Sequence, residues 1–154
     1  MPRRWGDELA SIIILCCNEL DYNRQCLESV LQHTRGPYEL ILVDNGSTDG
    51  TSEYLKEIQG KAEPARVIIM RNEKNVGFPA GCNQGLTKAR GRYLVFLNND
   101  TIVTNGWLEG LIASLVHWDD MYNIPSTPLT CCSMGAATGS TSSRWRMKLN
   151  VPLV

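Results

Sequence analysis

The chain of 154 residues is long enough for one domain with a sizeable hydrophobic core. Its composition, 43% hydrophobic and 20% charged residues, is that of an ordinary soluble globular protein. The formal net charge of −1, with acidic and basic residues interspersed, argues against binding to nucleic acid or to an anionic membrane surface.

No segment resembles a targeting signal or a membrane span. The apolar run at residues 12–17 is too short for either, and no run approaches the roughly 18 residues that a bilayer requires. We therefore expect a cytoplasmic protein, with the inner face of the membrane as a second option. The six cysteines form no CxxC pair, so their spacing favours small apolar filler in a reducing compartment over zinc ligands or disulfides.

Apolar runs alternate with segments of helical period over the first 116 residues. The runs predict four buried strands, at residues 11–17, 39–43, 67–70 and 93–97. Apolar residues then recur every three or four positions after each run, as in Leu108, Leu111, Ile112 and Leu115. Strands that are each followed by a helix predict the α/β class, with a parallel sheet flanked by helices and right-handed crossovers.

The alternation stops near His117. Residues 117–154 contain Pro125, Pro128 and a Gly/Ser/Thr-rich cluster over residues 135–143, and neither the strand period nor the helix period is present. We interpret this segment as irregular. It is either a disordered or poorly packed tail, or a truncated or misread continuation of the gene.

Polar residues cluster where three of the predicted strands end. Residues 17–19 (Cys-Asn-Glu) follow the first strand, residues 44–47 (Asp-Asn-Gly-Ser) the second, and residues 98–100 (Asn-Asn-Asp) the fourth. The backbone needs of a strand-to-helix turn would explain any one cluster equally well. Because open α/β sheets bind ligands beyond the carboxyl ends of their strands, three clusters at one edge predict a site.

Two common phosphate-binding sites are excluded. The first turn has no glycine, whereas a nicotinamide-binding Rossmann domain needs GxGxxG there, and the chain has no Walker A lysine loop. A cation held by acidic side chains is the natural alternative for neutralising a phosphate. Mg²⁺ typically binds one or two carboxylates plus phosphate oxygens, and Asp100 after an apolar strand suits that role.

Four motifs in the right order resemble those of family 2 glycosyltransferases of the GT-A fold, and the last of them resembles the variant of the metal motif common in rhamnosyltransferase-like members. They comprise residues 11–14 with Asn18, residues 43–51, residues 72–78 followed by 81–85, and residues 97–101 followed by 106–108. The resemblance extends over about residues 10–116. It implies that residues 9–116 are the nucleotide-sugar-binding half of a GT-A domain, a Rossmann-like parallel sheet incomplete at its C-terminal side.

The resemblance implies which residues contact the nucleoside. Cys17, through its backbone, and Asn18 would lie beside the base. Asp44 or Asn45 would contact the base or the ribose, and the family often has a second aspartate where Asn45 stands.

The resemblance also implies a metal site. Asn98 and Asp100 occupy the two ends of the family's DxD motif, so Asp100 would bind Mg²⁺ or Mn²⁺ and Asn98 would face the ribose or the sugar diphosphate. An asparagine in place of the first aspartate can still offer an oxygen. Asn83 is either a contact to the sugar or diphosphate or an ordinary surface amide of a helix.

The implied reaction is inverting transfer of a sugar from a UDP- or dTDP-type donor to a glycan or lipid-linked acceptor, in polysaccharide or glycan biosynthesis. In the family the catalytic base lies well beyond the metal strand, and Glu109, Asp119 and Asp120 do not suit that role, so no base is assigned. Three alternatives stay open: a transferase, a non-catalytic nucleotide-sugar-binding module or inactive truncated fragment, and a structural domain without ligand. A missing half of the sheet would leave an apolar edge exposed, which favours self-association.

Overall fold

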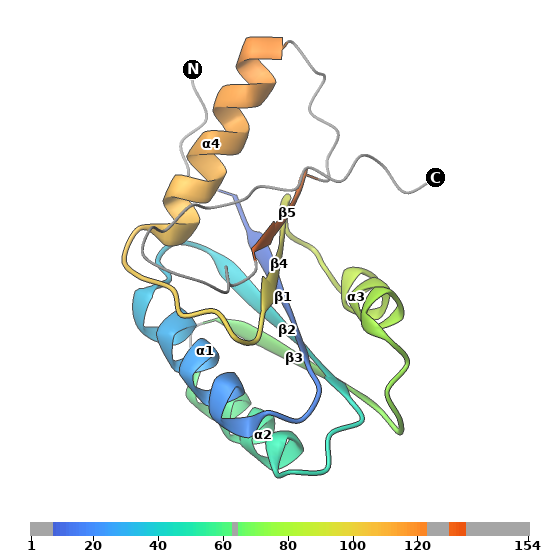
Figure 1. Ribbon diagram of the computed structural model, residues 1–154. Helices are drawn as coiled ribbons and strands as arrows, with labels where there is room; N and C mark the ends of the chain where they lie inside the picture. Colours follow the sequence, from blue (N-terminus) through green and yellow to red (C-terminus); the bar gives the residue numbers. More distant parts are fainter. Residues whose placement is uncertain (1–7, 63–64, 123–129, 135–154) are drawn as a thin grey trace, which may run out of the picture.

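A computed structural model describes residues 8–62, 65–122 and 130–134, with the backbone alone described from residue 116 onward. Strands and helices alternate along the described chain (Figure 1). The elements are β1 (Ala10–Cys16), α1 (Leu20–His33), β2 (Tyr38–Asn45), α2 (Thr51–Lys61), β3 (Arg66–Asn72), α3 (Phe78–Leu86), β4 (Tyr93–Asn98), α4 (Trp107–Tyr122) and β5 (Thr130–Met134).

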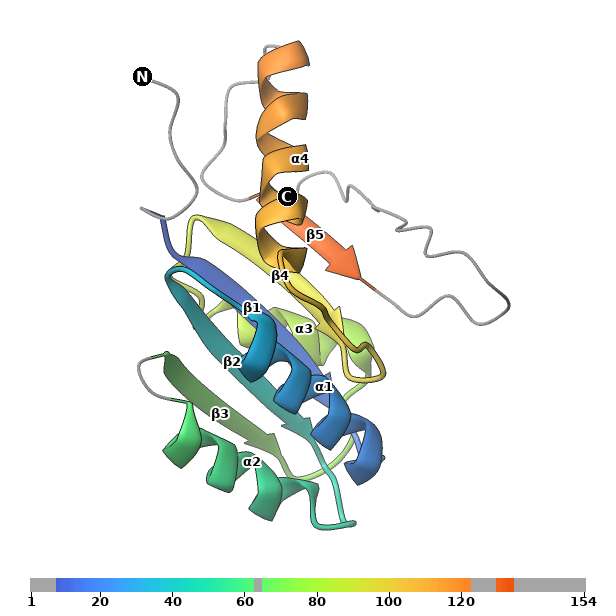
Figure 2. The ribbon, with the colours of Figure 1, turned by 90° about the vertical axis from the view of Figure 1, so that its left-hand side faces the viewer.

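All neighbouring strands of the sheet are parallel, and their order is β3-β2-β1-β4-β5 (Figure 2). The predicted α/β class with a parallel sheet is therefore confirmed. The chain places β2 and β3 on one side of β1, and then β4 and β5 on the other side. Strand order consequently reverses between β1 and β4, which is the position where open α/β sheets bind ligands.

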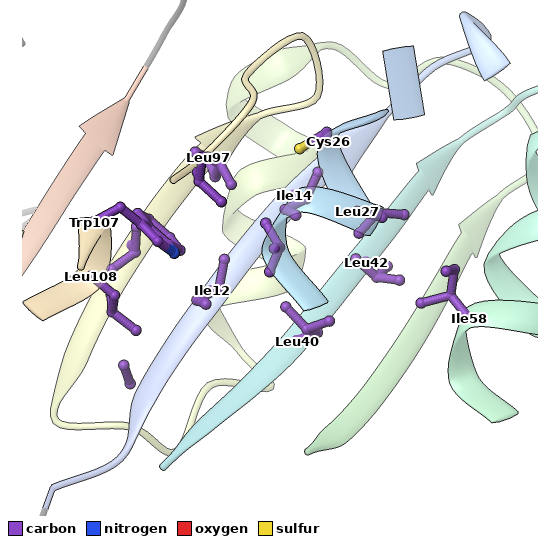
Figure 3. Packing of buried hydrophobic residues seen from close by; sticks show 14 of the residues in the cluster. Ile12, Ile14, Cys26, Leu27, Leu40, Leu42, Ile58, Leu97, Trp107 and Leu108 are labelled. Atoms are coloured by element: carbon purple, nitrogen blue, oxygen red, sulfur yellow. The ribbon is translucent and has the colours of Figure 1, made fainter. Parts of the chain in front are cut away.

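The main hydrophobic core lies between the sheet and the helices α1, α2 and α4. Side chains alternate along each strand, so Ile12 and Ile14 of β1 share one face with Leu40 and Leu42 of β2. Figure 3 shows these residues beside Leu27 of α1. The apolar runs of the sequence thus become strands that are covered on this face.

Helix α3 covers the opposite face of the sheet (Figure 1). Ile13, Ile41 and Val43 are buried beneath it. The helix lies close to the strands because Gly85 has no side chain: a Cβ at Gly85 would lie 2.6 Å from Cγ2 of Ile13. A larger residue at this position would push α3 away from the sheet.

A buried carboxylate fastens the amino-terminal edge of the sheet. Glu39 of β2 is 1% exposed, and its Oε1 accepts hydrogen bonds from the Ser11 hydroxyl at 2.6 Å and from the Arg90 backbone N–H at 2.7 Å. Its Oε2 accepts one from Nη1 of Arg66 at 3.1 Å. The Ser11 hydroxyl in turn accepts a hydrogen bond from the Gly91 N–H at 2.8 Å. These bonds tie the loop between α3 and β4 to β1 and β2.

The structure differs from the prediction of an irregular segment over residues 117–154. Helix α4 ends at Tyr122, and Thr130–Met134 forms strand β5, which pairs with β4 through the backbone. Residues 117–122 contain no glycine or proline to end the helix, and the five residues of β5 are too short a run to stand out by period. The remainder of residues 117–154 lies outside the described residues.

Candidate functional site

The ends of β1, β2 and β4 lie side by side at the carboxyl edge of the sheet. The register places Cys16 opposite Asp44, and Leu15 opposite Asn98. The polar clusters at residues 17–19, 44–47 and 98–100 therefore come together at one edge, next to the reversal of strand order between β1 and β4.

The turn between β1 and α1 has an unusual backbone. Asn18 and Glu19 both adopt the left-handed conformation, with φ of 54° and 61°. Such residues cost on the order of 1–2 kcal/mol each and persist only where their surroundings hold them. Here the Asn18 N–H donates to Oγ of Ser47 at 2.9 Å, and Oδ1 of Asn18 accepts from the Thr48 N–H at 2.8 Å. The loop after β2 thus fixes the turn after β1.

Asp49 completes this link between the two turns. Its Oδ2 accepts a hydrogen bond from the Leu20 N–H at 2.9 Å, and its Oδ1 accepts from the N–H and the hydroxyl of Thr51 at 3.1 and 2.7 Å. Its small burial raises the pKa of Asp49, but the bonds from Thr51 and Leu20 outweigh this effect and hold the pKa below its usual value. One exposed carboxylate thereby serves the first turns of both α1 and α2.

Asp44 is buried and bonded to protein groups. It is 1% exposed; its Oδ1 accepts a hydrogen bond from the Ser47 N–H at 2.9 Å, and its Oδ2 accepts from the Ser52 hydroxyl. Nε of Arg71 lies 3.7 Å from the same Oδ2. The side chain therefore holds the turn between β2 and α2, and its contact with a base or ribose stays a prediction.

Asn45 is buried to the same extent. Its amide is hydrogen-bonded to the loop between β3 and α3, through Asn75, Val76 and Gly77, and to Asn72 at the end of β3. Contact of Asn45 with a nucleoside also stays a prediction. The structure shows a side chain that organises a neighbouring loop.

The turn after β4 presents one carboxylate to solvent. Asp100 is exposed and makes no hydrogen bond or ion pair within the described part of the chain, whereas Asn98 is half-buried. The carbonyl of Asn98 accepts a hydrogen bond from the Thr101 N–H at 3.2 Å. Between them, Nδ2 of Asn99 donates to Oδ1 of Asn23 at 2.9 Å. The turn is thus anchored by Asn99, and Asp100 is left available to a ligand.

The protein ligands at this edge suit a divalent ion whose remaining ligands come from the substrate and water. Within residues 8–62 and 65–115, whose side chains the structure describes, no three His, Cys, Asp or Glu side chains come together. Mg²⁺ commonly binds one or two carboxylates and takes its other ligands from phosphate oxygens and water. Asp100 with the amide of Asn98 fits that kind of site and does not fit a preformed protein cage.

Cys17 and Asn83 lie in different surroundings. Cys17 is half-buried; its thiol donates to the Asn45 carbonyl at 3.5 Å and accepts from Nδ2 of Asn75 at 3.3 Å. Asn83 is exposed on α3, which leaves both of its predicted roles open.

No role is predicted from the sequence for Asn23, a buried residue that connects several parts of the edge. It is 0% exposed, and its Nδ2 donates to the Asn18 carbonyl at 2.7 Å and to Oγ1 of Thr51 at 3.1 Å. Together with its bond from Asn99, it joins the turns after β1 and β4 to α2. The sequence feature that indicates its burial is its position: Asn23 lies three and four residues before Cys26 and Leu27, on the buried face of α1.

Comparison with known proteins identifies the family. Residues 11–145 match the sequence model described as Glycosyl transferase family 2. The chain belongs to glycosyltransferase family 2. This membership agrees with the parallel sheet, the polar strand ends and the order of the motifs.

One curated relative of this glycosyltransferase chain is TuaG of Bacillus subtilis (strain 168), which is named as a teichuronic acid biosynthesis glycosyltransferase. It is 36% identical over 92 residues, which are 60% of this chain and 36% of TuaG. The chain spans 16–36% of the length of three curated glycosyltransferases that it matches.

Solved structures share the GT-A-like fold of this glycosyltransferase chain. Residues 1–349 of TarS of S. aureus, solved with UDP-GlcNAc, superpose with a TM-score of 0.64 at 20% identity, over 88% of this chain and 37% of that one. The mannosyltransferase PcManGT of Pyrobaculum calidifontis, solved with GDP-Man and Mn²⁺, gives a TM-score of 0.55 at 22% identity, over 59% of this chain and 27% of that one. The rhamnosyltransferase-like variant stays a prediction.

The cysteines differ in accessibility, which leads to a testable result. Cys16 and Cys26 are buried, and burial raises both thiol pKa values, that of Cys26 to about 12, whereas Cys17 and Cys82 are half-buried. Since the thiolate is the reactive form, native protein treated with iodoacetamide at about pH 8 should be modified at Cys17 and Cys82 before Cys16 and Cys26. Peptide mapping by mass spectrometry checks this order, with urea-unfolded protein as the control. Rapid native labelling of Cys26 would contradict it.

Proposed function

We propose that this chain binds a nucleotide-diphosphate sugar of the UDP or dTDP type at the carboxyl edge of its sheet, as the donor-binding part of an inverting glycosyltransferase. The observation that carries the proposal is the exposed carboxylate of Asp100 on the turn after β4, beside the reversal of strand order. Membership of glycosyltransferase family 2 supports it, as does the fold shared with TarS, which was solved with UDP-GlcNAc.

Different turns of this edge bind different parts of the nucleotide-sugar donor. The turn over residues 17–19 borders the nucleoside, and its strained backbone is fixed before the ligand arrives, which lowers the entropy lost on binding. The sugar diphosphate lies toward Asn98 and Asp100, and Asp100 holds Mg²⁺ or Mn²⁺. When bound, the ion neutralises charge that develops on the leaving diphosphate. Asn83 on α3 is a candidate contact to the sugar or diphosphate.

Transfer needs a second group, which removes the proton from the attacking hydroxyl of the acceptor. We assign this role to no residue. The acceptor class is a glycan or a lipid-linked sugar of a polysaccharide pathway, because TuaG is named for teichuronic acid biosynthesis. Such an enzyme would act in the cytoplasm or at the inner face of the membrane. Among the described residues, no helix has the length and apolar character needed to span a bilayer.

A nucleotide titration tests the donor site. The melting temperature of the purified chain is followed with UDP, dTDP or GDP, each with and without Mn²⁺ or Mg²⁺, and ADP serves as the control nucleotide. A ligand at 100-fold excess over its dissociation constant stabilises the folded state by about 2.7 kcal/mol. We expect UDP or dTDP to raise the melting temperature, and the metal to increase that rise. Absence of a shift with every nucleotide would refute the proposal.

The same preparation separates a transferase from a non-catalytic binding module. The chain spans about a third of TuaG, so binding of the donor without transfer is a distinct candidate function. Release of UDP from a bound UDP-sugar is measured with and without a glycan acceptor. Release that depends on the acceptor supports a transferase, whereas tight binding without release supports the binding module.

A further inference from the structure

The amide of Asn45 is fully used inside the protein. Its Oδ1 accepts hydrogen bonds from Nδ2 of Asn72 at 3.1 Å and from the Val76 N–H at 3.0 Å. Its Nδ2 donates to Oδ1 of Asn75 at 2.9 Å and to the Gly77 carbonyl at 3.4 Å. An amide offers two donors and two acceptor positions, so Asn45 has no hydrogen-bonding capacity left for a ligand.

Three of the four partners of the Asn45 amide, Asn75, Val76 and Gly77, belong to one short segment, residues 73–77, which we call the β3–α3 loop. The loop also packs tightly against the turn after β2: a Cβ at Gly46, whose φ is +80°, would lie 2.7 Å from the backbone carbon of Lys74. On its other side, Nδ2 of Asn75 donates to the Cys17 thiol at 3.3 Å. The loop therefore lies beside the turn after β1, at the carboxyl edge of the sheet.

A second pair of amides anchors the start of the loop. Asn72 and Gln84 exchange two hydrogen bonds, of 2.8 and 2.9 Å, which connect the end of β3 to α3. A row of amides thus runs from Gln84 through Asn72 and Asn45 to Asn75, and ends at Cys17. Cooperative rows of this kind depend on every member presenting a donor on one side and an acceptor on the other.

From this arrangement we propose that Asn45 is a positioning residue that shapes the β3–α3 loop into a wall of the nucleotide site, and that this role requires an amide. A carboxylate at position 45 keeps the two bonds to Oδ1 but loses both donors, and it places a negative oxygen against Oδ1 of Asn75 and the Gly77 carbonyl. Asn45 therefore acts on a nucleotide through the loop and not by contact. The effect on a nucleotide rests on the proposed function, whereas the positioning of the loop does not.

The decisive variant is Asn45→Asp, which changes shape little, removes both donors and puts a negative oxygen in their place. We expect its affinity for UDP with Mn²⁺ to fall at least about tenfold relative to the wild type at about pH 8, because two hydrogen bonds are replaced by repulsion. A direct contact between residue 45 and the base predicts the opposite, since an aspartate at this position is common in the family. Affinity within about twofold of the wild type would overturn the proposal.

A pH series gives a readout that a general loss of packing would not produce. The introduced carboxyl is buried and faces two oxygens, so its pKa is raised and protonation restores one donor. As the pH falls from about 8 to about 5, the affinity of Asn45→Asp relative to the wild type at the same pH should recover. The other charged or titratable groups on the surrounding elements are present in both proteins, so their own titration cancels in the ratio of the two affinities. These groups are Cys17, Asp44, Asp49, Arg71, Glu73 and Lys74. A ratio that stays constant with pH would contradict the proposal.

The control carries the same amide-to-acid change at another place. Asn105 lies in the loop before α4 and bonds with its Oδ1 to Nδ1 of His33, at the far end of α1 from the candidate site. Asn105→Asp should leave the UDP affinity unchanged. A parallel loss of affinity in this control would show that the effect of Asn45→Asp is not specific to the loop, and would overturn the proposal.

Hydrogen exchange tests the positioning without any nucleotide. In the free wild-type chain the N–H of Val76 bonds to Asn45 and that of Gly77 bonds to Oδ1 of Asn75 at 2.8 Å. Both amides should exchange at least about tenfold faster in Asn45→Ala, while the strand amides of β1 keep their protection. Unchanged exchange would overturn the proposal. If wild-type protein bound no nucleotide but these amides responded as expected, the proposed function would fail and the loop assignment would stand.

Discussion

Replacing Glu39 by alanine should lower the free energy of unfolding by about 3 kcal/mol. Glu39 is 1% exposed and receives hydrogen bonds from Ser11, Arg66 and the Arg90 N–H. Alanine leaves the buried Ser11 hydroxyl and the Arg90 N–H without their acceptor, and it removes the negative charge beside Arg66. For a chain of this size such a loss corresponds to a fall of roughly 6–12 °C in the melting temperature.

Glu39→Gln is the matched control. A glutamine keeps an oxygen that accepts from Ser11 and Arg90, and Arg66, whose side chain is 45% exposed, can turn to solvent. We therefore expect this variant to lose much less stability than the alanine variant, in chemical denaturation at neutral pH. Equal losses in the two variants would show that the charge is the essential feature. A melting temperature of Glu39→Ala close to that of the wild type would refute the assigned role altogether.

The strands and their direction could be predicted because their signal is local. Each of the four predicted strands is a continuous apolar run, and three of the four runs are followed directly by Asp or Asn, so the sequence indicates the carboxyl edge of the sheet. The alternation of strand and helix implied parallel strands, which the structure confirms. Asp100 was identified in the same way, as an acidic residue directly after an apolar strand.

The burial of Asp44 and Asn45 could not be predicted in this way. The groups that bond to the Asn45 amide lie 27 to 32 residues further along the chain, so no local pattern indicates that this amide is used internally. Asp44 resembles an ordinary polar residue at a strand end, yet Ser52, in the first turn of α2, donates to it. A polar residue that follows a strand can thus serve either a ligand or a neighbouring turn, and only the tertiary structure distinguishes the two.

Strand β5 illustrates a second limit. Its five residues include two cysteines, a serine and a threonine, and they lie between segments without any period. The strand exists because the free edge of β4 offers backbone donors and acceptors, which pair with residues 130–134. Backbone pairing at a sheet edge depends weakly on side chains, so the sequence carries little trace of it.

Replacing Asp100 by alanine should abolish the part of nucleotide binding that depends on a divalent ion. Asp100 is the exposed carboxylate of the turn after β4, and the amide of Asn98 alone is a weak ligand for Mg²⁺ or Mn²⁺. We expect titration calorimetry to show that Mn²⁺ increases the UDP affinity of the wild type at least about tenfold, and that this increase is absent in Asp100→Ala. The affinity measured with EDTA should be the same in both proteins.

The melting temperature of the free Asp100→Ala variant should equal that of the wild type, because the exposed carboxylate makes no hydrogen bond or ion pair within the described part of the chain. Asp21→Ala is the matched control: it removes another exposed carboxylate, from the first turn of α1, and should keep the dependence on metal. A metal-dependent increase that survives in Asp100→Ala would place the ion elsewhere. Loss of the increase in both variants would instead indicate a general effect of negative charge at this edge. Comparison of Asp100→Ala with Asp21→Ala therefore distinguishes a specific metal ligand at residue 100 from such a general effect.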